Sequence, residues 1–114
     1  MFDFQDLNVY KKAKAFHSII HLLITQNTFH KTVVDQLWRA SFSNPLNIAE
    51  GSGRFSKKDR KNFFVISRSS VFEVVAILDL LNDAHSISSS EFEEFCAKAE
   101  ELSKILYAMI KNLS

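Results

Sequence analysis

The chain has 114 residues, a formal net charge of +1 and 46% hydrophobic residues, which suits one globular domain and excludes a disordered segment. It contains only two glycines, Gly51 and Gly53, and one proline, Pro45, so the many tight turns of a β-sandwich or barrel are excluded and long helices are favoured. We expect a cytoplasmic protein without a membrane span or a signal peptide, because no apolar run approaches about 18 residues and the lone Cys96 cannot form an internal disulfide.

The spacing of apolar residues predicts a first helix from about Asp6, which can cap it, to Thr25. A second helix is predicted from Thr32, with Asp35 in an approximate capping box, to about Glu50, before the two glycines. Pro45 lies inside it, and proline removes a backbone hydrogen bond, so we expect a kink there. The residues of these two helices expected in the core are Val9, Tyr10, Ala13, Phe16, Ile20, Leu23, Ile24, Leu37, Ala40 and Ile48.

A third helix is predicted from the Ser56 cap, with Asp59 three residues on, to about Asp83. The expected inner stripe of this helix is Phe63, Ile66, Ser70, Val74, Ile77, Leu78 and Leu81. Residues 88–90 are serines that can cap a fourth helix, with glutamates following in its first turn. Its stripe of Phe92, Phe95, Ala99, Leu102, Leu106, Met109 and Leu113 is typical of near-parallel helix packing. The sequence therefore predicts one all-α domain over residues 1–114, an antiparallel up-down-up-down four-helix bundle.

More apolar residues are present than a lone bundle needs. The third helix also carries Phe64, Val71, Phe72, Val75 and Leu80 outside the expected stripe, and the first carries Ile19 and Leu22. A surface helix normally has one apolar stripe, so a second apolar face indicates homo-oligomerisation.

Charge is unevenly distributed along the sequence. Residues 1–70 carry 11 lysines and arginines and 5 acidic residues, whereas residues 71–114 carry 3 lysines and arginines and 8 acidic residues. The basic half suits phosphate contacts, but we favour attraction between the halves, within or between subunits.

A polar stripe follows the second helix. Arg39, Ser43, Asn47 and Glu50 recur at steps of four, four and three, and Ser70 and Glu73 on the third helix can face them. One interpretation is a site for an anion or a partner chain. The favoured one is a structural network in which Arg39 pairs with Glu73 or Glu50, because buried polar groups need partners.

The segment between the second and third helices is the best candidate for nucleic-acid contact. Glycines expose backbone N–H groups there, the next helix N-terminus attracts anions, and five cations cluster: Arg54, Lys57, Lys58, Arg60 and Lys61. The alternative is an ordinary solvated turn, and both interpretations stay open. The segment is not a phosphate-binding P-loop, since the glycine spacing differs.

Other reactive side chains suggest no catalytic or metal centre. His17 and His21 share a helical face, but His17-Ser18-Ile19-Ile20-His21 lacks a metalloprotease glutamate, so surface or interface histidines are favoured and no metal or cofactor is expected. Cys96 is expected to be a small half-buried hydrophobe, and Trp38 an interface anchor or a core residue. We expect no enzyme activity.

Three blocks resemble a known family. Residues 36–54, QLWRASFSNPLNIAEGSGR, resemble the signature of the four-helix-bundle proteins of the 23S rRNA intervening-sequence family. Residues 63–73, FFVISRSSVFE, are similar to its third-helix motif, and residues 4–10, FQDLNVY, to its start. The third-helix motif usually has glycine where Ser69 stands.

The resemblance implies a ring-like homopentamer. The family includes proteins encoded within rRNA gene insertions, and the accessory variability protein of diversity-generating retroelements, which binds nucleic acid and the reverse transcriptase. That nucleic-acid-binding branch is strongly basic, whereas this chain is nearly neutral. The hypothesis is therefore a non-enzymatic homo-oligomeric scaffold that engages a protein or nucleic-acid partner. The alternative is an accessory protein that binds RNA or DNA through the basic stretch from Arg54 to Arg68.

Overall fold

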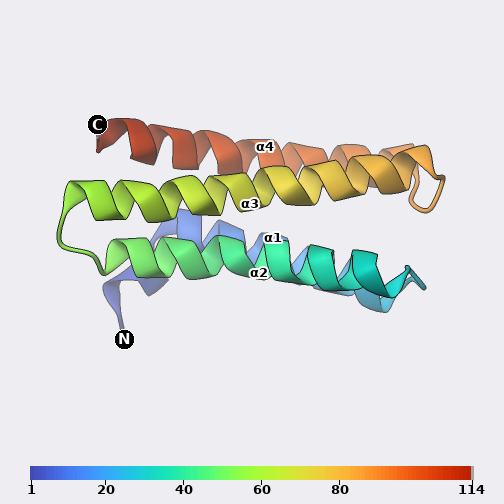
Figure 1. Cartoon of the computed structure of the whole chain (residues 1–114), viewed down its shortest axis with the longest axis horizontal. Helices are drawn as coiled ribbons and strands as arrows, with labels where there is room; N and C mark the ends of the chain where they lie inside the picture. Colours follow the sequence, from blue (N-terminus) through green and yellow to red (C-terminus); the bar gives the residue numbers. More distant parts are fainter. Residues whose placement is uncertain (114) are drawn as a thin grey trace.

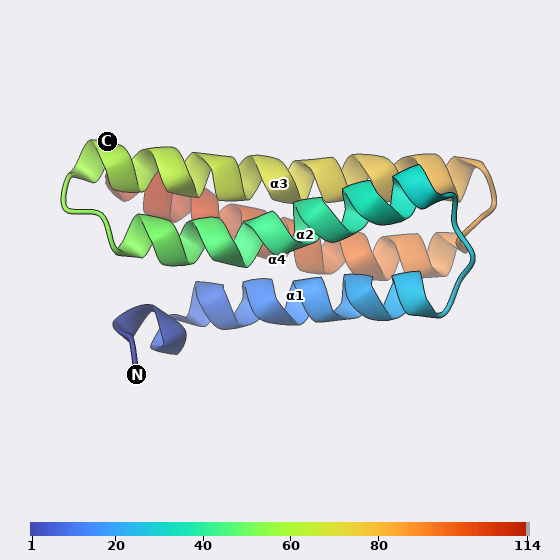
Figure 2. The same ribbon diagram turned by 60° about the horizontal axis from the view of Figure 1, so that its bottom comes forward.

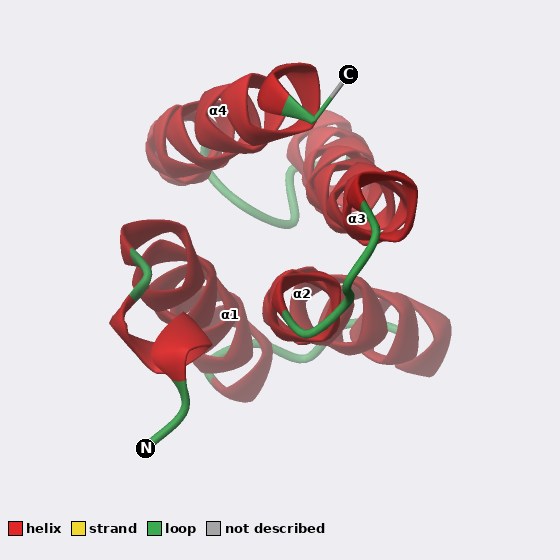
Figure 3. Cartoon of the chain, turned by 90° about the vertical axis from the view of Figure 1, so that its left-hand side faces the viewer, coloured by secondary structure: helices red, strands yellow, loops and turns green. Residues whose placement is uncertain are grey.

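Four α-helices make up most of the chain in the computed structural model, which describes residues 1–113. After a short 3-10 helix, η1 (Asp3–Asp6), come α1 (Asn8–Thr25), α2 (Lys31–Ser52), α3 (Lys57–Asp83) and α4 (Ser89–Asn112). The helices run alternately up and down (Figure 1), each packs against its sequence neighbours, and α1 contacts α4. Seen from one end (Figure 3), the four helices surround a shared interior, which confirms the predicted all-α four-helix bundle.

The core draws on all four helices at the predicted spacings. In α1 the side chains at steps of three and four are buried, because that spacing returns to one face of a helix: Val9, Ala13, Phe16, Ile20 and Leu23. The other two predicted core residues of α1, Tyr10 and Ile24, are half-buried and pack against this core. The largest fully buried apolar side chains are Ile20, Leu37, Ile48, Val71, Val74, Leu78, Leu102 and Leu106. The bundle measures 44 × 26 × 22 Å, with its long dimension along the helices.

The start of α3 was predicted correctly, and α4 begins at one of the three serines expected to cap it. The Ser56 hydroxyl accepts a hydrogen bond from Asp59 N at 3.1 Å. At α4 the Ser88 hydroxyl accepts from Glu91 N, and the Glu91 carboxylate accepts from Ser88 N, both at 3.0 Å, which completes a capping box.

The starts of α1 and α2 differ from the prediction. Asp6 belongs to η1 and does not cap α1, which begins after Leu7 without a side-chain cap. The cap of α2 is His30, whose Nδ1 accepts from Thr32 N at 3.1 Å. A histidine cap is easily missed, because serine, threonine, aspartate and asparagine dominate this position.

α2 continues two residues beyond the predicted end at Glu50, to Ser52. Gly51 lies inside the helix and is buried, because α3 passes so close that a Cβ there would lie 2.8 Å from Phe64 Cε1. This glycine therefore serves close packing instead of ending the helix. Pro45 is accommodated within α2, and the ribbon of α2 changes direction along its length (Figure 2), as expected for an internal proline.

The inner face of α3 differs from the prediction in its first half, whereas Ser70, Val74, Leu78 and Leu81 are buried as predicted. Ile66 is exposed and Phe63 only half-buried, whereas Phe64, Ser67 and Val71 are buried. The prediction did not include Ser67, whose hydroxyl is hydrogen-bonded inside the bundle. Phe64 and Val71 thus belong to the interior, and Phe72 and Leu80 remain as exposed apolar side chains on α3.

Candidate functional site

The predicted cations gather at one end of the bundle, where the loop between α2 and α3 turns (Figure 1). Arg54 Cζ lies 4.7 Å from the centre of the Phe63 ring, and Arg60 Nε donates to the Arg54 carbonyl oxygen at 2.7 Å. These contacts hold the loop against the first turn of α3. Lys57 and Lys58 are exposed beside them, and Lys61 is half-buried.

A shallow hollow of about 570 Å³ adjoins this loop. Its walls come from η1, the end of α2, the start of α3 and the end of α4, and it is mainly apolar; the lining includes Phe2, Phe4, Leu7, Gly53, Arg60, Phe64 and Met109. Arg60 links the hollow to the loop. Phe55, at the tip of the loop, is fully exposed. The hollow was not foreseen from the sequence, because its walls come from elements that meet only in the folded chain.

The opposite end of the bundle has the opposite charge. Asp83 ends α3, and Glu91, Glu93 and Glu94 lie in the first turns of α4, around the loop that joins these helices. In Figure 1 this loop lies at the far end from the α2–α3 loop. The charge difference between the two halves of the sequence therefore becomes a difference along the bundle axis.

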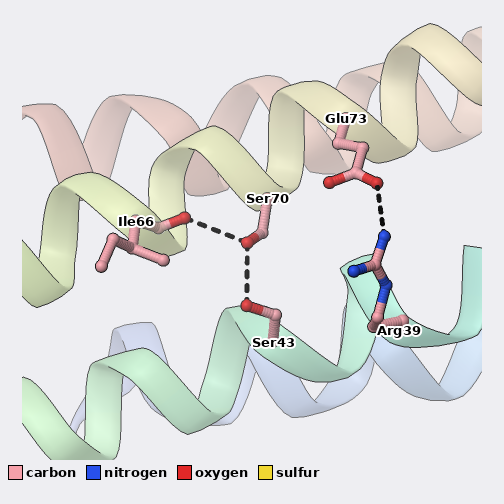
Figure 4. Close-up of polar contacts among 5 residues, drawn as sticks. All are labelled: Arg39, Ser43, Ile66, Ser70 and Glu73. Atoms are coloured by element: carbon pink, nitrogen blue, oxygen red, sulfur yellow. Dashed lines mark hydrogen bonds and ion pairs between the residues drawn. The ribbon is translucent and has the colours of Figure 1, made fainter. Parts of the chain in front are cut away.

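The predicted polar stripe is only partly brought together (Figure 4). The Ser70 hydroxyl donates to the Ile66 carbonyl oxygen at 3.0 Å and lies 3.0 Å from the Ser43 hydroxyl, with which it shares a hydrogen bond. Arg39 faces Glu73 with a nitrogen–oxygen distance of 3.9 Å, but both side chains are largely exposed, so this pair contributes only about 0–1 kcal/mol.

Asn47 and Glu50 complete the stripe. Asn47 Nδ2 donates to the Ser43 carbonyl and hydroxyl oxygens, within α2. Glu50 is exposed and makes no side-chain hydrogen bond or ion pair within residues 1–113. The stripe is therefore a set of local and inter-helix contacts at the surface of the α2–α3 interface.

The deeper polar contact between α2 and α3 was missed. Asn44 and Ser67 are both completely buried. Asn44 Nδ2 donates to the Ser67 hydroxyl at 2.7 Å and to its carbonyl oxygen at 3.0 Å, and the Ser67 hydroxyl donates to the Asn44 carbonyl oxygen at 2.8 Å. Asn44 Oδ1 is buried without a partner among the described residues. Such a reciprocal pair fixes the register of the two helices.

An apolar surface made by α1 and α2 contains three aromatic rings and a leucine. We call this surface the α1–α2 face; its residues are His17, Trp38, Phe42 and Leu46. The Trp38 and Phe42 rings stack at 4.5 Å, and the His17 ring meets both edge-on at 5.5 Å. His17 Nδ1 lies 2.8 Å from the Ser41 hydroxyl. Burial, and then the neighbouring His21, lower the pKa of His17. Trp38, Phe42 and Leu46 remain 38–44% exposed, so this cluster is an apolar surface.

A second apolar surface, the α3–α4 face, contains Val65, Arg68, Phe72 and Tyr107. Arg68 Cζ lies 4.7 Å from the Phe72 ring and 5.5 Å from the Tyr107 ring, and its Nε donates to the Ser103 carbonyl oxygen at 3.1 Å. Arg68 therefore belongs to this face and not to the basic end. The three apolar side chains are 43–54% exposed.

A groove of about 380 Å³ continues the α3–α4 face past Phe72, with Asp79, Cys96 and Glu100 in its lining. Burial raises the pKa of the Cys96 thiol, and Asp79, Glu100 and Glu93 add to the effect. The thiol is therefore held in its neutral form.

Residues 1–113 contain no group of three or more histidine, cysteine, aspartate or glutamate side chains placed to hold a metal ion. Within the same range no helix is long and apolar enough to cross a bilayer.

The structure so far defines a class: a small four-helix bundle with one basic end and two exposed apolar faces. The sequence model of the 23S rRNA-intervening sequence protein family matches residues 5–108, so the chain belongs to this family. A search of curated proteins finds no match. Among solved structures, a protein of unknown function from the S23 ribosomal protein family of Bacteroides thetaiotaomicron has a similar fold, with a TM-score of 0.85. It is 24% identical, and the match covers 90% of this chain and 98% of that one.

Proposed function

We propose that this chain is a cytoplasmic, non-enzymatic scaffold that assembles with copies of itself, as a pentamer by family resemblance. The observation that carries the proposal is the presence of two different exposed apolar faces, one on the α1–α2 pair and one on the α3–α4 pair. A lone small domain gains nothing from such surfaces, and contact with another subunit removes them from water.

The two faces carry different side chains. The α1–α2 face presents the stacked Trp38 and Phe42 rings, whereas the α3–α4 face carries Arg68 and continues into a groove lined by Asp79 and Glu100. Unlike surfaces give head-to-tail assembly, which closes into a ring when the rotation per subunit allows it.

The mass in solution tests assembly directly. Sedimentation or light scattering of the whole chain at micromolar concentration is expected to give one oligomer, with five copies the number that family resemblance implies. A monodisperse monomer would contradict the proposal.

We propose, second, that the basic end of the scaffold contacts RNA or DNA. Five cations lie within eight residues, in the loop and first turn of α3 from Arg54 to Lys61, and Glu91, Glu93 and Glu94 of α4 lie at the other end. Assembly around a ring aligns the basic ends of several copies, which multiplies a weak contact.

Phosphate contacts make affinity depend on salt. We expect affinity for a short RNA to fall steeply between about 50 and 200 mM salt, and the double variant Lys57→Glu, Lys58→Glu to bind weakly with a smaller salt slope. The matched control is Lys31→Glu with Lys98→Glu, which changes net charge equally away from the basic end. Equal losses in the two variants would show that only net charge matters.

A further inference from the structure

We infer that the basic end holds a single-stranded segment of nucleic acid, with an unpaired base stacked on Phe55 and a neighbouring base in the adjacent apolar hollow. This inference rests on the proposed nucleic-acid contact and adds to it the form of the ligand. Three features of the same end carry it: an exposed aromatic ring, surrounding cations and an apolar recess.

Phe55 is the first feature. It lies between α2 and α3 with its side chain fully exposed. The rest of the loop is well anchored, since Arg54 lies over the Phe63 ring, Arg60 donates to the Arg54 carbonyl oxygen and Ser56 caps α3. The loop thus presents the Phe55 ring to solvent from a fixed backbone. An exposed aromatic ring on an anchored loop is a platform on which a nucleobase stacks.

The cations flank this ring on both sides in the sequence. Arg54 precedes Phe55, and Lys57, Lys58 and Lys61 follow within six residues. A nucleic-acid strand carries one phosphate per base, so a base stacked on Phe55 brings its own and the adjoining phosphates to these side chains. Basic residues interleaved with an exposed aromatic ring are the usual arrangement of single-strand sites.

The hollow is the third feature. Its volume of about 570 Å³ exceeds that of a nucleobase, and its apolar wall includes Phe2, Phe4 and Phe64. Arg60 at its rim reaches the loop through the Arg54 carbonyl oxygen. A base that enters the hollow leaves its phosphate near the cations of the loop, so one strand can occupy both positions.

A duplex does not fit this end equally well. Bases inside a duplex are covered on both faces by their neighbours, and only the two terminal pairs expose a face, so a duplex makes mainly phosphate contacts at this end. A neutral apolar partner would use Phe55 and the hollow but not the cations. A single strand is the ligand that uses all three features together.

Fluorescence anisotropy tests the inference with a labelled 12-nucleotide RNA and the corresponding 12-base-pair duplex, titrated with the whole chain at low salt. We expect Phe55→Ala to weaken single-strand binding roughly tenfold or more and duplex binding less than about twofold. Phe55→Trp is expected to restore single-strand binding. Because Phe55 is exposed, the solution mass of both variants should equal that of the unmodified chain. A single-stranded RNA containing 2-aminopurine should lose fluorescence on binding, since stacking quenches that base.

The outcomes separate the two proposals. If Phe55→Ala binds both RNAs like the unmodified chain while Lys57→Glu, Lys58→Glu weakens both, the phosphate contact holds and stacking is wrong. If Phe55→Ala weakens both RNAs equally, the preference for a single strand is wrong. If the unmodified chain binds neither RNA at low salt, both proposals fail.

Discussion

Two buried polar side chains, Asn44 and Ser67, hold α2 and α3 together at the level of single residues. Their hydrogen bonds of 2.7–3.0 Å run in both directions across the interface, and neither residue is exposed to solvent. An unmade hydrogen bond inside a protein costs more than a made one contributes, so each partner depends on the other.

Ser67→Ala removes both the donor to the Asn44 carbonyl oxygen and the acceptor for Asn44 Nδ2. We expect the free energy of unfolding to fall by about 1–2 kcal/mol, measured by urea denaturation. The control is Ser69→Ala, two residues away on the exposed side of α3, which should change stability by less than about 0.5 kcal/mol. Both changes replace serine by alanine in a helix, so propensity cancels between them. Equal stabilities for the two variants would contradict the structural role of Ser67.

Protonation of His17 makes the free energy of unfolding depend on pH. Burial first, and then His21, hold the pKa of His17 below its usual value of 6.5. The unfolded chain therefore takes up this proton at a higher pH than the folded chain does. The contribution of His17 to stability is complete above about pH 6.5 and is lost as pH falls from there toward the lower folded pKa.

Substitution of His17 should accordingly weaken this dependence. We expect the free energy of unfolding of His17→Gln to fall less between about pH 7 and pH 5 than that of the unmodified chain. His85→Asn is the control, because His85 lies in the α3–α4 loop with a φ of 59° that asparagine tolerates. A pH dependence unchanged in His17→Gln would show that His17 does not titrate differently in the two states.

At the scale of elements, the close approach of α2 and α3 depends on Gly51. A Cβ at this position would lie 2.8 Å from Phe64 Cε1 and 2.9 Å from Phe63 Cβ. At Gly53 the nearest atom would be the Glu50 carbonyl oxygen at 3.6 Å, and φ is −87°, which any residue adopts.

Alanine at the two glycines should therefore have different effects. We expect Gly51→Ala to be less stable than Gly53→Ala by about 1–3 kcal/mol, because the added methyl forces α2 and α3 apart. Both variants lose the flexibility of glycine in the unfolded chain, so thermal denaturation of the pair isolates the steric effect. If Gly51→Ala were the more stable, α3 could not be packed against α2 as described.

Sequence patterns predicted the elements well where the pattern is local. The Ser88–Glu91 box and the regular apolar steps of α4 involve residues three or four apart, so the signal lies within one helix. The inner face of α3 was predicted less well. There Ile66 points outward while Ser67 points inward, because Ser67 meets Asn44 on another helix.

In the candidate site, too, the features that depend on neighbouring residues in the sequence were predicted, and those that depend on contacts between distant elements were not. The five cations were found because they are close in sequence, and their common end of the bundle follows from the up-and-down order of the helices. The apolar hollow beside them combines η1, α2, α3 and α4, which meet only in the folded chain. Arg68 was grouped with the cations, yet the helix carries it to the α3–α4 face beside Tyr107.

At the scale of the whole molecule, the two apolar faces decide how copies join. Head-to-tail contact pairs the α1–α2 face of one copy with the α3–α4 face of the next, whereas two-fold contact pairs each face with itself. One variant of each face distinguishes these arrangements: Phe42→Glu for the α1–α2 face, and Phe72→Glu for the α3–α4 face. Both side chains are exposed, at 38% and 54%, so the changes are directed at the surface.

With head-to-tail contact, each variant alone lacks one half of every interface and should be a monomer in sedimentation. A one-to-one mixture should form dimers and nothing larger, because the intact α3–α4 face of the first variant meets the intact α1–α2 face of the second. With two-fold contact, each variant alone would still dimerise through its unchanged face. Thr28→Glu, at an exposed position in the loop between α1 and α2, should assemble like the unmodified chain and excludes a general effect of added charge. Monomers in the mixture would refute the pairing of the two faces.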